Sequence, residues 1–190
     1  MNFLKNVVFI KSIFNKKDLV TDDLPQVIFA GKSNVGKSSF INTITNNKKM
    51  AKVGNTPGKT KCINHFVIDG KINMFDLPGY GFSRMSQVEK DNINKLTDTF
   101  LNNNKNIKQL FLLIDIRHKP TKDDRAMYEW ILSKDIPFTI IASKADKVAK
   151  TKVDDYIAVI RKELFAKEDI IAFSSETKLG LDEVVDKILN

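Results

Sequence analysis

The eight residues Gly31-Lys32-Ser33-Asn34-Val35-Gly36-Lys37-Ser38 decide the fold of this chain. An apolar run at 27–30 precedes them and predicts a buried strand, and the apolar residues from Phe40 to Ile44 predict a helix after them. A strand, the pattern G-x-x-x-x-G-K-S and a helix, in this order, form the P-loop arrangement. The alternative is a glycine-rich turn that matches by chance, and it does not account for the motifs that follow.

Each fixed residue of this loop has a physical task. The two glycines let the loop wrap closely, so that backbone N–H groups point inward at a phosphate. The helix that begins at Lys37 adds its positive end and its free N–H groups. We expect Lys37 to reach the β- and γ-phosphates of a nucleotide and the Ser38 hydroxyl to bind Mg²⁺.

Length and composition bound the class of protein. The chain has 190 residues, of which 42% are apolar and 28% charged, as in a soluble globular domain. No apolar run approaches the length of a membrane span, and the first residues are too broken by Lys5 and Lys11 for a secretory signal. The single cysteine, Cys62, excludes an intrachain disulfide and suits the reducing cytoplasm. The net charge of +8 favours polyanionic partners.

The rest of the chain alternates between predicted strands and helices. Residues 7–14 predict either a first strand or an arm packed on the sheet edge, and residues 46–60 predict a long loop. Apolar runs at 65–68 and 72–75 flank Asp69-Gly70 and predict a hairpin. Further strands are predicted at 110–115, 138–142 and 170–173, and helices at 87–101, 153–165 and 180–189. Another helix is predicted after the cap Thr121-Lys122-Asp123-Asp124, with an apolar face of Ala126, Met127, Trp130 and Ile131.

This order of elements predicts the fold class. Most predicted strands are followed by helices, so the sheet should be mainly parallel and covered on both faces. We therefore expect an α/β fold of three layers, a P-loop NTPase domain over residues 25–190, with one antiparallel strand from the hairpin. Residues 1–24 are expected to form an N-terminal extension packed on this domain.

A second candidate motif, Asp76-Leu77-Pro78-Gly79, follows the second strand of the hairpin. Ligands of an open parallel sheet bind at the carboxyl ends of its strands, so the loop motifs should converge. Asp76 could hold Mg²⁺ through water opposite Ser38, and the Gly79 N–H could contact the γ-phosphate. The alternative is a plain turn, because D-x-x-G is also a common turn sequence.

A third motif, Ser143-Lys144-Ala145-Asp146, follows a buried strand and predicts the choice of base. The Asp146 carboxylate can accept hydrogen bonds from N1–H and the exocyclic amine of guanine, which adenine does not offer. Lys144 can lay its alkyl stem along the base. Ser174-Ser175-Glu176 follows the last strand and would complete the pocket with backbone N–H groups. The alternative is a solvated pair of loop charges.

At this point the sequence resembles the translation-factor-related P-loop GTPases and, more closely, the EngB family of bacterial GTPases. The resemblance covers nearly the whole chain, and the motifs run in unpermuted order. Its carriers are residues 31–42, Thr56-Pro57-Gly58-Lys59-Thr60, Asp76-Leu77-Pro78-Gly79-Tyr80-Gly81, Ser143-Lys144-Ala145-Asp146 and Ser174-Ser175.

The resemblance implies a G domain that hydrolyses GTP, with Lys37, Thr60 and Gly79 as catalytic residues. Ser38 and Thr60 would bind Mg²⁺, and residues 58–62 would form the first switch. The implied nucleotide site consists of Gly31, Lys32, Ser33, Asn34, Val35, Gly36, Lys37, Ser38, Gly58, Lys59, Thr60, Lys61, Cys62, Asp76, Leu77, Pro78, Gly79, Ser143, Lys144, Ala145, Asp146, Ser174, Ser175 and Glu176.

Several residues need separate interpretation. Ser143 stands where Asn or Thr is usual, but its hydroxyl could still tie this loop to the P-loop. Tyr80 stands where many small GTPases have a water-orienting glutamine, so unaided hydrolysis should be slow. Asn34 matches the position that coordinates potassium in some GTPases, which would make K⁺ a second cofactor. Cys62 is interpreted as an unreactive thiol, and the two histidines have no partner at metal-ligand spacing.

The sequence thus predicts a Mg²⁺-dependent GTPase switch, monomeric and cytoplasmic, with GTP and GDP as ligands. The family resemblance implies a role in large ribosomal subunit assembly and a requirement for normal cell division and septation. Lys48, Lys49 and Lys52 are either a solvated loop or a contact to ribosomal RNA. The alternatives are a ribosome- or RNA-binding module in which nucleotide is mainly structural, and a P-loop kinase or ATPase, which Asp146 disfavours.

Overall fold

A seven-stranded sheet forms the centre of the molecule in the computed structural model, which describes residues 2–51, 62–81, 85–102 and 104–190. The strand order is β1-β3-β4-β2-β5-β6-β7, and only β3 runs against the other six. The strands are β1 Val7–Ile13, β2 Gln26–Gly31, β3 Ile63–Ile68, β4 Ile72–Asp76, β5 Ile107–Asp115, β6 Phe138–Ser143 and β7 Ile170–Ala172. The predicted mainly parallel sheet with one antiparallel hairpin strand is confirmed.

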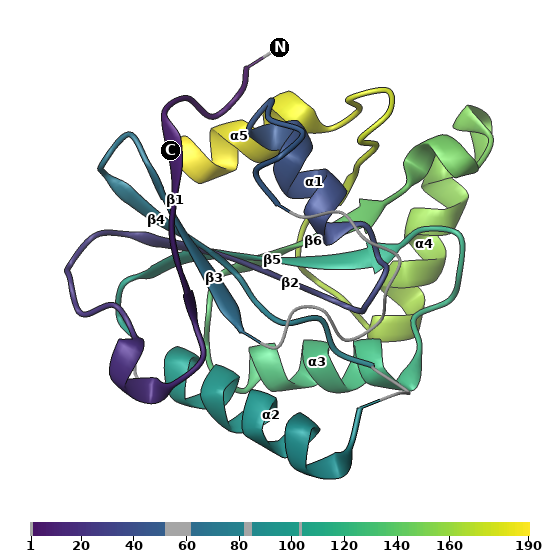
Figure 1. Ribbon diagram of the computed structural model, residues 1–190. Helices are drawn as coiled ribbons and strands as arrows, with labels where there is room; N and C mark the ends of the chain where they lie inside the picture. Colours follow the sequence, from purple (N-terminus) through teal and green to yellow (C-terminus); the bar gives the residue numbers. More distant parts are fainter. Residues whose placement is uncertain (1, 52–61, 82–84, 103) are drawn as a thin grey trace.

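Helices cover both faces of this sheet (Figure 1). The α-helices are α1 Lys37–Ile44, α2 Gln87–Leu101, α3 Lys122–Leu132, α4 Val153–Leu164 and α5 Leu181–Leu189. Short 3₁₀ turns occur at η1 Lys16–Asp18, η2 Ala145–Lys147 and η3 Lys150–Lys152. No helix of the described part of the chain is long and apolar enough to cross a membrane.

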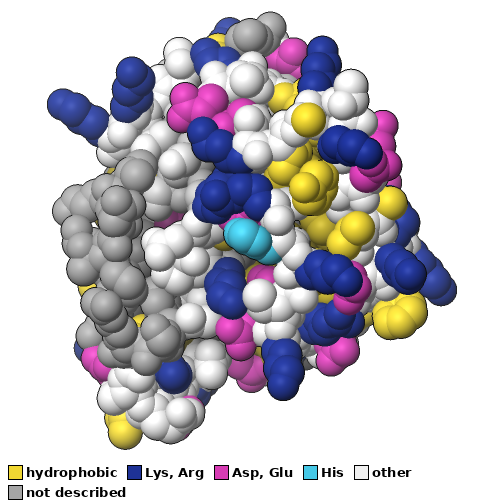
Figure 2. All heavy atoms as spheres, turned by 90° about the vertical axis from the view of Figure 1, so that its right-hand side faces the viewer, with side chains coloured by type: hydrophobic (Ala, Val, Ile, Leu, Met, Phe, Trp, Pro, Cys, Tyr) yellow, Lys and Arg dark blue, Asp and Glu magenta, His cyan; other side chains and the backbone are white. Residues whose placement is uncertain are grey.

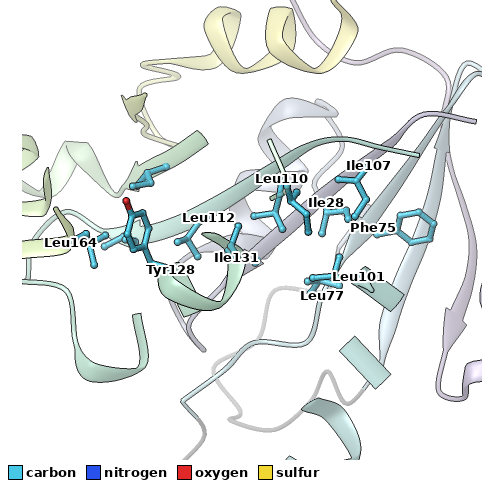
Figure 3. Close-up of a cluster of buried hydrophobic side chains, with 14 of the residues drawn as sticks. Ile28, Phe75, Leu77, Leu101, Ile107, Leu110, Leu112, Tyr128, Ile131 and Leu164 are labelled. Carbon is cyan, nitrogen blue, oxygen red and sulfur yellow. The ribbon is translucent and has the colours of Figure 1, made fainter. Parts of the chain in front are cut away.

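Alternate residues of the central strands supply two separate cores. In β2, Val27 and Phe29 pack with α1 and α5, whereas Ile28 and Ala30 pack toward α2, α3 and α4. Figure 3 shows part of the second core, in which Leu112 lies beside Ile131 and Leu164 lies beside Tyr128. Because both faces of the central strands are buried, their sequences are continuous apolar runs.

The N-terminal segment is a strand at the sheet edge, which combines the two alternatives drawn from the sequence. β1 pairs with β3 from Val7↔Ile68 to Ile13↔Ile63, with a bulge between Phe9 and Lys11. The hairpin between β3 and β4 turns at Asp69 and Gly70, whose φ angles are +50° and +67°. Two successive positive φ angles identify the type I′ turn that an Asp-Gly pair favours.

The buried face of α3 differs from the prediction. Tyr128 and Ile131 are buried, whereas Ala126 is exposed, and Met127 and Trp130 are only partly buried. The Tyr128 hydroxyl donates a hydrogen bond to Glu168 at 2.8 Å, so the polar end of this ring is satisfied at the rim of the core. The predicted face was correct for Ile131, which is buried, and for Met127 and Trp130, which pack against the core, but the buried face includes Tyr128 and not Ala126.

Candidate functional site

The P-loop connects β2 to α1 and needs its two glycines for different reasons. A Cβ atom at Gly31 would lie 2.8 Å from Val35 Cγ1 and 3.1 Å from Leu113 Cβ, so no larger residue fits there. Gly36 has a φ of +104° and caps the start of α1. Asn34 also has a positive φ, +64°, which asparagine tolerates. The loop is therefore held in one shape at the carboxyl end of β2.

Lys37 and Asp76 meet at the centre of this loop. Both side chains are buried, and the Lys37 ammonium forms an ion pair with the Asp76 carboxylate. The same ammonium donates to the carbonyl of Leu77 at 2.7 Å. The residue expected to bind phosphates and the carboxylate expected to act on the metal thus lie in direct contact, as their positions at two neighbouring strand ends predicted.

The segment from Asp76 to Tyr80 lies against the P-loop. The Leu77 N–H donates to Phe29 at 3.0 Å, and the Ser33 N–H donates to the Tyr80 carbonyl at 2.9 Å. The Tyr80 hydroxyl donates to Asp124 at 2.9 Å. Burial and the neighbouring carboxylate raise the pKa of Tyr80 well above its usual value, so the phenol stays protonated. The Tyr80 hydroxyl is thus hydrogen-bonded to a residue of α3.

The loop after β6 is tied to the P-loop by two side chains. The Ser143 hydroxyl lies 2.8 Å from the Val35 carbonyl, which is the contact proposed for this serine from the sequence. Lys144 has a positive φ of +61° and donates to the Asn34 carbonyl at 2.8 Å and to Asp115 at 2.9 Å. The alkyl stem of Lys144 lies over Gly36, as a residue placed along a base above the loop would.

Asp146 and Ser174 come together beyond Lys144. The Ser174 hydroxyl donates to Asp146 at 2.8 Å and accepts bonds from the N–H groups of Glu176 and Thr177. Lys147 lies 2.9 Å from the other carboxylate oxygen of Asp146. Burial opposes ionisation of Asp146, but the bonds from Lys147 and Ser174 outweigh it and lower its pKa. The group expected to read guanine is therefore an ionised acceptor.

Some predicted site residues lie elsewhere or cannot be placed. The Lys32 side chain extends toward α3, with its ammonium 3.0 Å from the Thr121 hydroxyl and 3.3 Å from Asp123. Cys62 is buried, and burial raises the pKa of its thiol, which fits an unreactive cysteine. Six residues for which a role was predicted lie outside the described part of the chain, namely Thr56, Pro57, Gly58, Lys59, Thr60 and Lys61.

Sequence reasoning missed Asp115 as a site residue, and it missed the contacts of Thr121 and Asp124 with the site. Asp115 ends β5, accepts two bonds from the Arg117 guanidinium and one from Lys144, and so belongs to the site. Its position at a strand end was the available signal, because the other loop motifs were found in the same way. Thr121 and Asp124 form the capping box of α3, and nothing local in the sequence shows that Lys32 and Tyr80 reach this cap.

The site offers oxygen donors and positive charge. Ser38 lies in the first turn of α1 and Asp76 at the end of β4, and hydroxyl and carboxylate oxygens suit a hard cation such as Mg²⁺. The described residues contain no group of three or more His, Cys, Asp or Glu side chains that could hold a metal. His65 is hydrogen-bonded to the Asn73 side chain at 2.8 Å inside the sheet. Burial lowers the pKa of His65.

Two clefts flank the loop segments. One of about 340 Å³ lies on the outer side of the P-loop and is lined by Asn34, Asp115, Arg117 and Lys144, among others. The larger, of about 870 Å³, begins at Leu77–Gly81 and continues between α2 and α3. Figure 2 shows the face toward which these loops point, where Lys and Arg side chains alternate with Asp and Glu.

Comparison with known proteins identifies the group to which this geometry belongs. Residues 26–144 match the family model described as 50S ribosome-binding GTPase. The chain is 42% identical over 187 residues to the probable GTP-binding protein EngB of Streptococcus sanguinis, covering 97% of this chain and 96% of that protein. The chain belongs to the EngB family of GTP-binding proteins. The EngB protein of Thermoanaerobacter pseudethanolicus is 40% identical, over 96% of this chain and 95% of its own length.

The EngB family assignment agrees with the fold. A crystal structure of a probable GTP-binding protein EngB superposes with a TM-score of 0.71, covering 86% of this chain and 96% of that chain, at 22% identity. The resemblance stated from the motifs is confirmed, and the chain is a GTP-binding GTPase of the EngB family. The P-loop, the Asp76 segment and the loops after β6 and β7, which were predicted to face the nucleotide, lie at the carboxyl ends of the parallel strands of this G domain.

Proposed function

We propose that this EngB protein is a Mg²⁺-dependent GTPase switch that acts on the large ribosomal subunit during its assembly. The observation that carries the proposal is the match of residues 26–144 to a family described as 50S ribosome-binding GTPase. The site supplies the switch, because Lys37 and Asp76 lie in contact where a γ-phosphate and its metal would be sensed.

The roles proposed for the site residues come from the motifs and from the family resemblance. Ser38 and Thr60 would hold Mg²⁺ directly and Asp76 through water, and K⁺ through Asn34 would be an additional cation. Bound Mg²⁺ would neutralise charge on the phosphates. Lys37 would exchange its contact with Asp76 for the β- and γ-phosphate oxygens, and the Gly79 N–H would bind the γ-phosphate. Residues 58–62 would close as the first switch.

Hydrolysis is expected to be slow without a partner. Attack of water on the γ-phosphate needs a group that orients the water. Tyr80 occupies the position of that group, and its hydroxyl is bonded to Asp124 on α3. A partner that completes the site would therefore accelerate turnover, and ribosomal particles are the candidate.

The charge of the molecule supports a ribosomal partner. Lys48 and Lys49 are exposed, and neither forms an ion pair with a described residue. They precede Lys52, Lys59 and Lys61 in the sequence, so the segment before β3 is basic throughout. Basic side chains next to a nucleotide-dependent loop could join GTP binding to contact with RNA phosphates.

The cellular role extends the same proposal. A monomeric factor that assembles large subunits would act in the cytoplasm, and failure of assembly would disturb cell division and septation. The second candidate is a constitutive ribosome- or RNA-binding module in which nucleotide is mainly structural, and the high lysine content favours it too. The two differ in whether nucleotide state changes the contact.

Cosedimentation with purified large subunits distinguishes them. The protein is loaded with a non-hydrolysable GTP analogue or with GDP, and binding is measured at several salt concentrations. A switch binds in one state, and replacing Lys48, Lys49 and Lys52 by Ala reduces the salt slope by up to about three contacts without changing guanine-nucleotide affinity. Equal binding of both nucleotide forms would support the constitutive module. A triple variant that binds like wild type would show that these three lysines do not contact the subunit.

A further inference from the structure

The outer side of β1 combines exposed apolar side chains with lysines. β1 is the last strand of the sheet and pairs only with β3 among the described residues (Figure 1). The exposed fractions are 57% for Val8, 50% for Phe9, 48% for Ile10 and 61% for Phe14. We call these residues, together with Lys5, Lys11, Lys16 and Lys17, the β1 edge.

The lysines of the β1 edge form no ion pair with any described residue. All four are exposed. The first carboxylate in the sequence is Asp18, so all charged side chains of residues 1–17 are positive. Around the nucleotide site, by contrast, Lys32, Lys37 and Lys144 are each paired with a carboxylate. A run of unpaired cations attracts a polyanion.

Two exposed phenylalanine rings lie close to these lysines in the sequence. The Phe9 ring packs edge-on against Phe66 at 5.4 Å between centroids, which fixes its orientation while half of its surface stays exposed. Phe14 follows the last residue of β1 and is more exposed still. Aromatic rings next to unpaired basic side chains form the platform on which the bases of a single strand stack.

The geometry of β1 favours a nucleic acid strand over a membrane. Val8 lies opposite Val67 and Phe9 opposite Phe66, so consecutive apolar side chains point to opposite faces of the sheet. An inserted membrane anchor needs its apolar side chains on one face. A protein interface would have to desolvate the lysines at its centre, where lysine is depleted.

From this combination we propose that the β1 edge binds single-stranded RNA. The inference rests on the proposed ribosomal function and adds a second contact to it, apart from the Lys48 segment. β1 also adjoins the chain that follows the expected first switch, because Ile13 pairs with Ile63 and the Ser12 hydroxyl bonds Asn64 at 2.8 Å. An RNA strand bound to β1 would therefore lie next to β3, the strand that follows the expected first switch.

The test uses three variants of the full chain. The charge variant replaces Lys5, Lys11, Lys16 and Lys17 by Gln, and the ring variant is Phe14→Ala, whose ring makes no aromatic contact among the described residues. The matched control replaces four other exposed lysines by Gln, namely Lys105, Lys150, Lys162 and Lys167. GDP affinity and thermal unfolding confirm that each variant is folded, since none of these residues lies in the nucleotide site.

Binding is measured by fluorescence anisotropy on a labelled twelve-nucleotide uridine RNA, and by cosedimentation on large subunits. The charge variant should bind the RNA at least about tenfold more weakly, with a salt slope reduced by up to about 3. Phe14→Ala should lose about fivefold or more, and the control should bind like wild type. Both test variants should also bind the particles more weakly.

Several outcomes overturn the inference. One is that wild type does not bind the RNA at low salt, and another is that the charge variant binds it like the control. Preferential binding of wild type to phosphatidylglycerol vesicles would assign the edge to a membrane, and dimerisation abolished by Phe14→Ala would assign it to a second copy. If wild type binds particles and the variants match it, only this inference fails. If wild type binds particles in neither nucleotide state, the proposed function fails.

Discussion

Asp115 is one of the residues that connect the loops at the carboxyl ends of the strands. It accepts bonds from Arg117 at 2.8 and 2.9 Å and from Lys144 at 2.9 Å, and Lys144 in turn holds the P-loop carbonyl of Asn34. Burial opposes ionisation, but the bonds from Arg117 and Lys144 outweigh it and lower the pKa of Asp115 to about 2. One carboxylate thus connects the ends of three neighbouring strands.

The lowered pKa of Asp115 predicts how the free energy of unfolding depends on pH. Because the pKa of Asp115 in the folded state lies below its ordinary value of 3.8, its contribution is present above pH 3.8 and is lost as the pH falls toward 2. Asp115→Asn should lower the free energy of unfolding at neutral pH by about 1–2 kcal/mol and flatten the loss in that range. Urea unfolding at several pH values measures both. Asp155→Asn, at an exposed ion pair, is the control, and parallel curves for the two variants would contradict the role of Asp115.

Ser38 and Thr60 give a second prediction at this scale, because they differ in which nucleotide state needs them. Ser38→Ala should weaken Mg²⁺-dependent binding of GDP and GTP alike, by at least about tenfold. Thr60→Ala should spare GDP and weaken the GTP analogue, since only that state draws the first switch inward. Titration of a fluorescent nucleotide with and without a chelator separates the two. Equal losses for both nucleotides in Thr60→Ala would remove it from the switch.

At the scale of elements, α3 is joined to the loop that would sense the γ-phosphate. Asp124 closes the capping box of α3 through Thr121 and also accepts the Tyr80 hydroxyl. Lys32 of the P-loop reaches the same cap through Thr121. Movement of the Asp76–Tyr80 segment would therefore alter the hydrogen bonds at the N-terminus of α3.

Tyr80→Phe tests this connection. Removal of the hydroxyl should cost about 1 kcal/mol of unfolding free energy, because Asp124 loses one of its donors in a buried position. Thr121→Ala should cost about as much through loss of the cap. The two losses should not be additive, since both act on Asp124. Tyr156→Phe, on the surface of α4, is the matched control, and an equal effect of the two tyrosine variants would refute the connection.

The elements also show what the sequence could predict. The start of α3 was predicted correctly because Thr121 and Asp124 form a capping box that local sequence reveals. The bulge in β1 was not predictable, since it depends on pairing with β3, a strand that begins 50 residues after β1 ends. The predicted apolar face of α3 was correct except at Ala126, which is exposed, and at Tyr128, which is buried, because the sheet decides the limits of the covered face. Asp115 was missed because a single carboxylate carries no motif.

At the scale of the whole molecule, the site is assembled from strand ends that are far apart in sequence. The P-loop follows β2, Asp76 ends β4, Asp115 ends β5, Ser143 ends β6, and Ser174 follows β7. Parallel strands bring their carboxyl ends to one edge, so five loops meet there without any long-range signal in the sequence. We propose that guanine nucleotides bind at this edge, with the base at the loops after β6 and β7 and the phosphates at the P-loop and the Asp76 segment.

Nucleotide selectivity of wild type and Asp146→Asn is the most direct test of this central claim. Displacement of a fluorescent GDP analogue by GTP, ATP and XTP is measured for both proteins. Wild type should prefer GTP over ATP by at least about 100-fold, because adenine would leave the ionised Asp146 carboxylate unmatched. Asp146→Asn should shift the preference from GTP toward XTP. Comparable affinities of wild type for ATP and GTP, or an unchanged order in Asp146→Asn, would contradict the assignment of the base pocket.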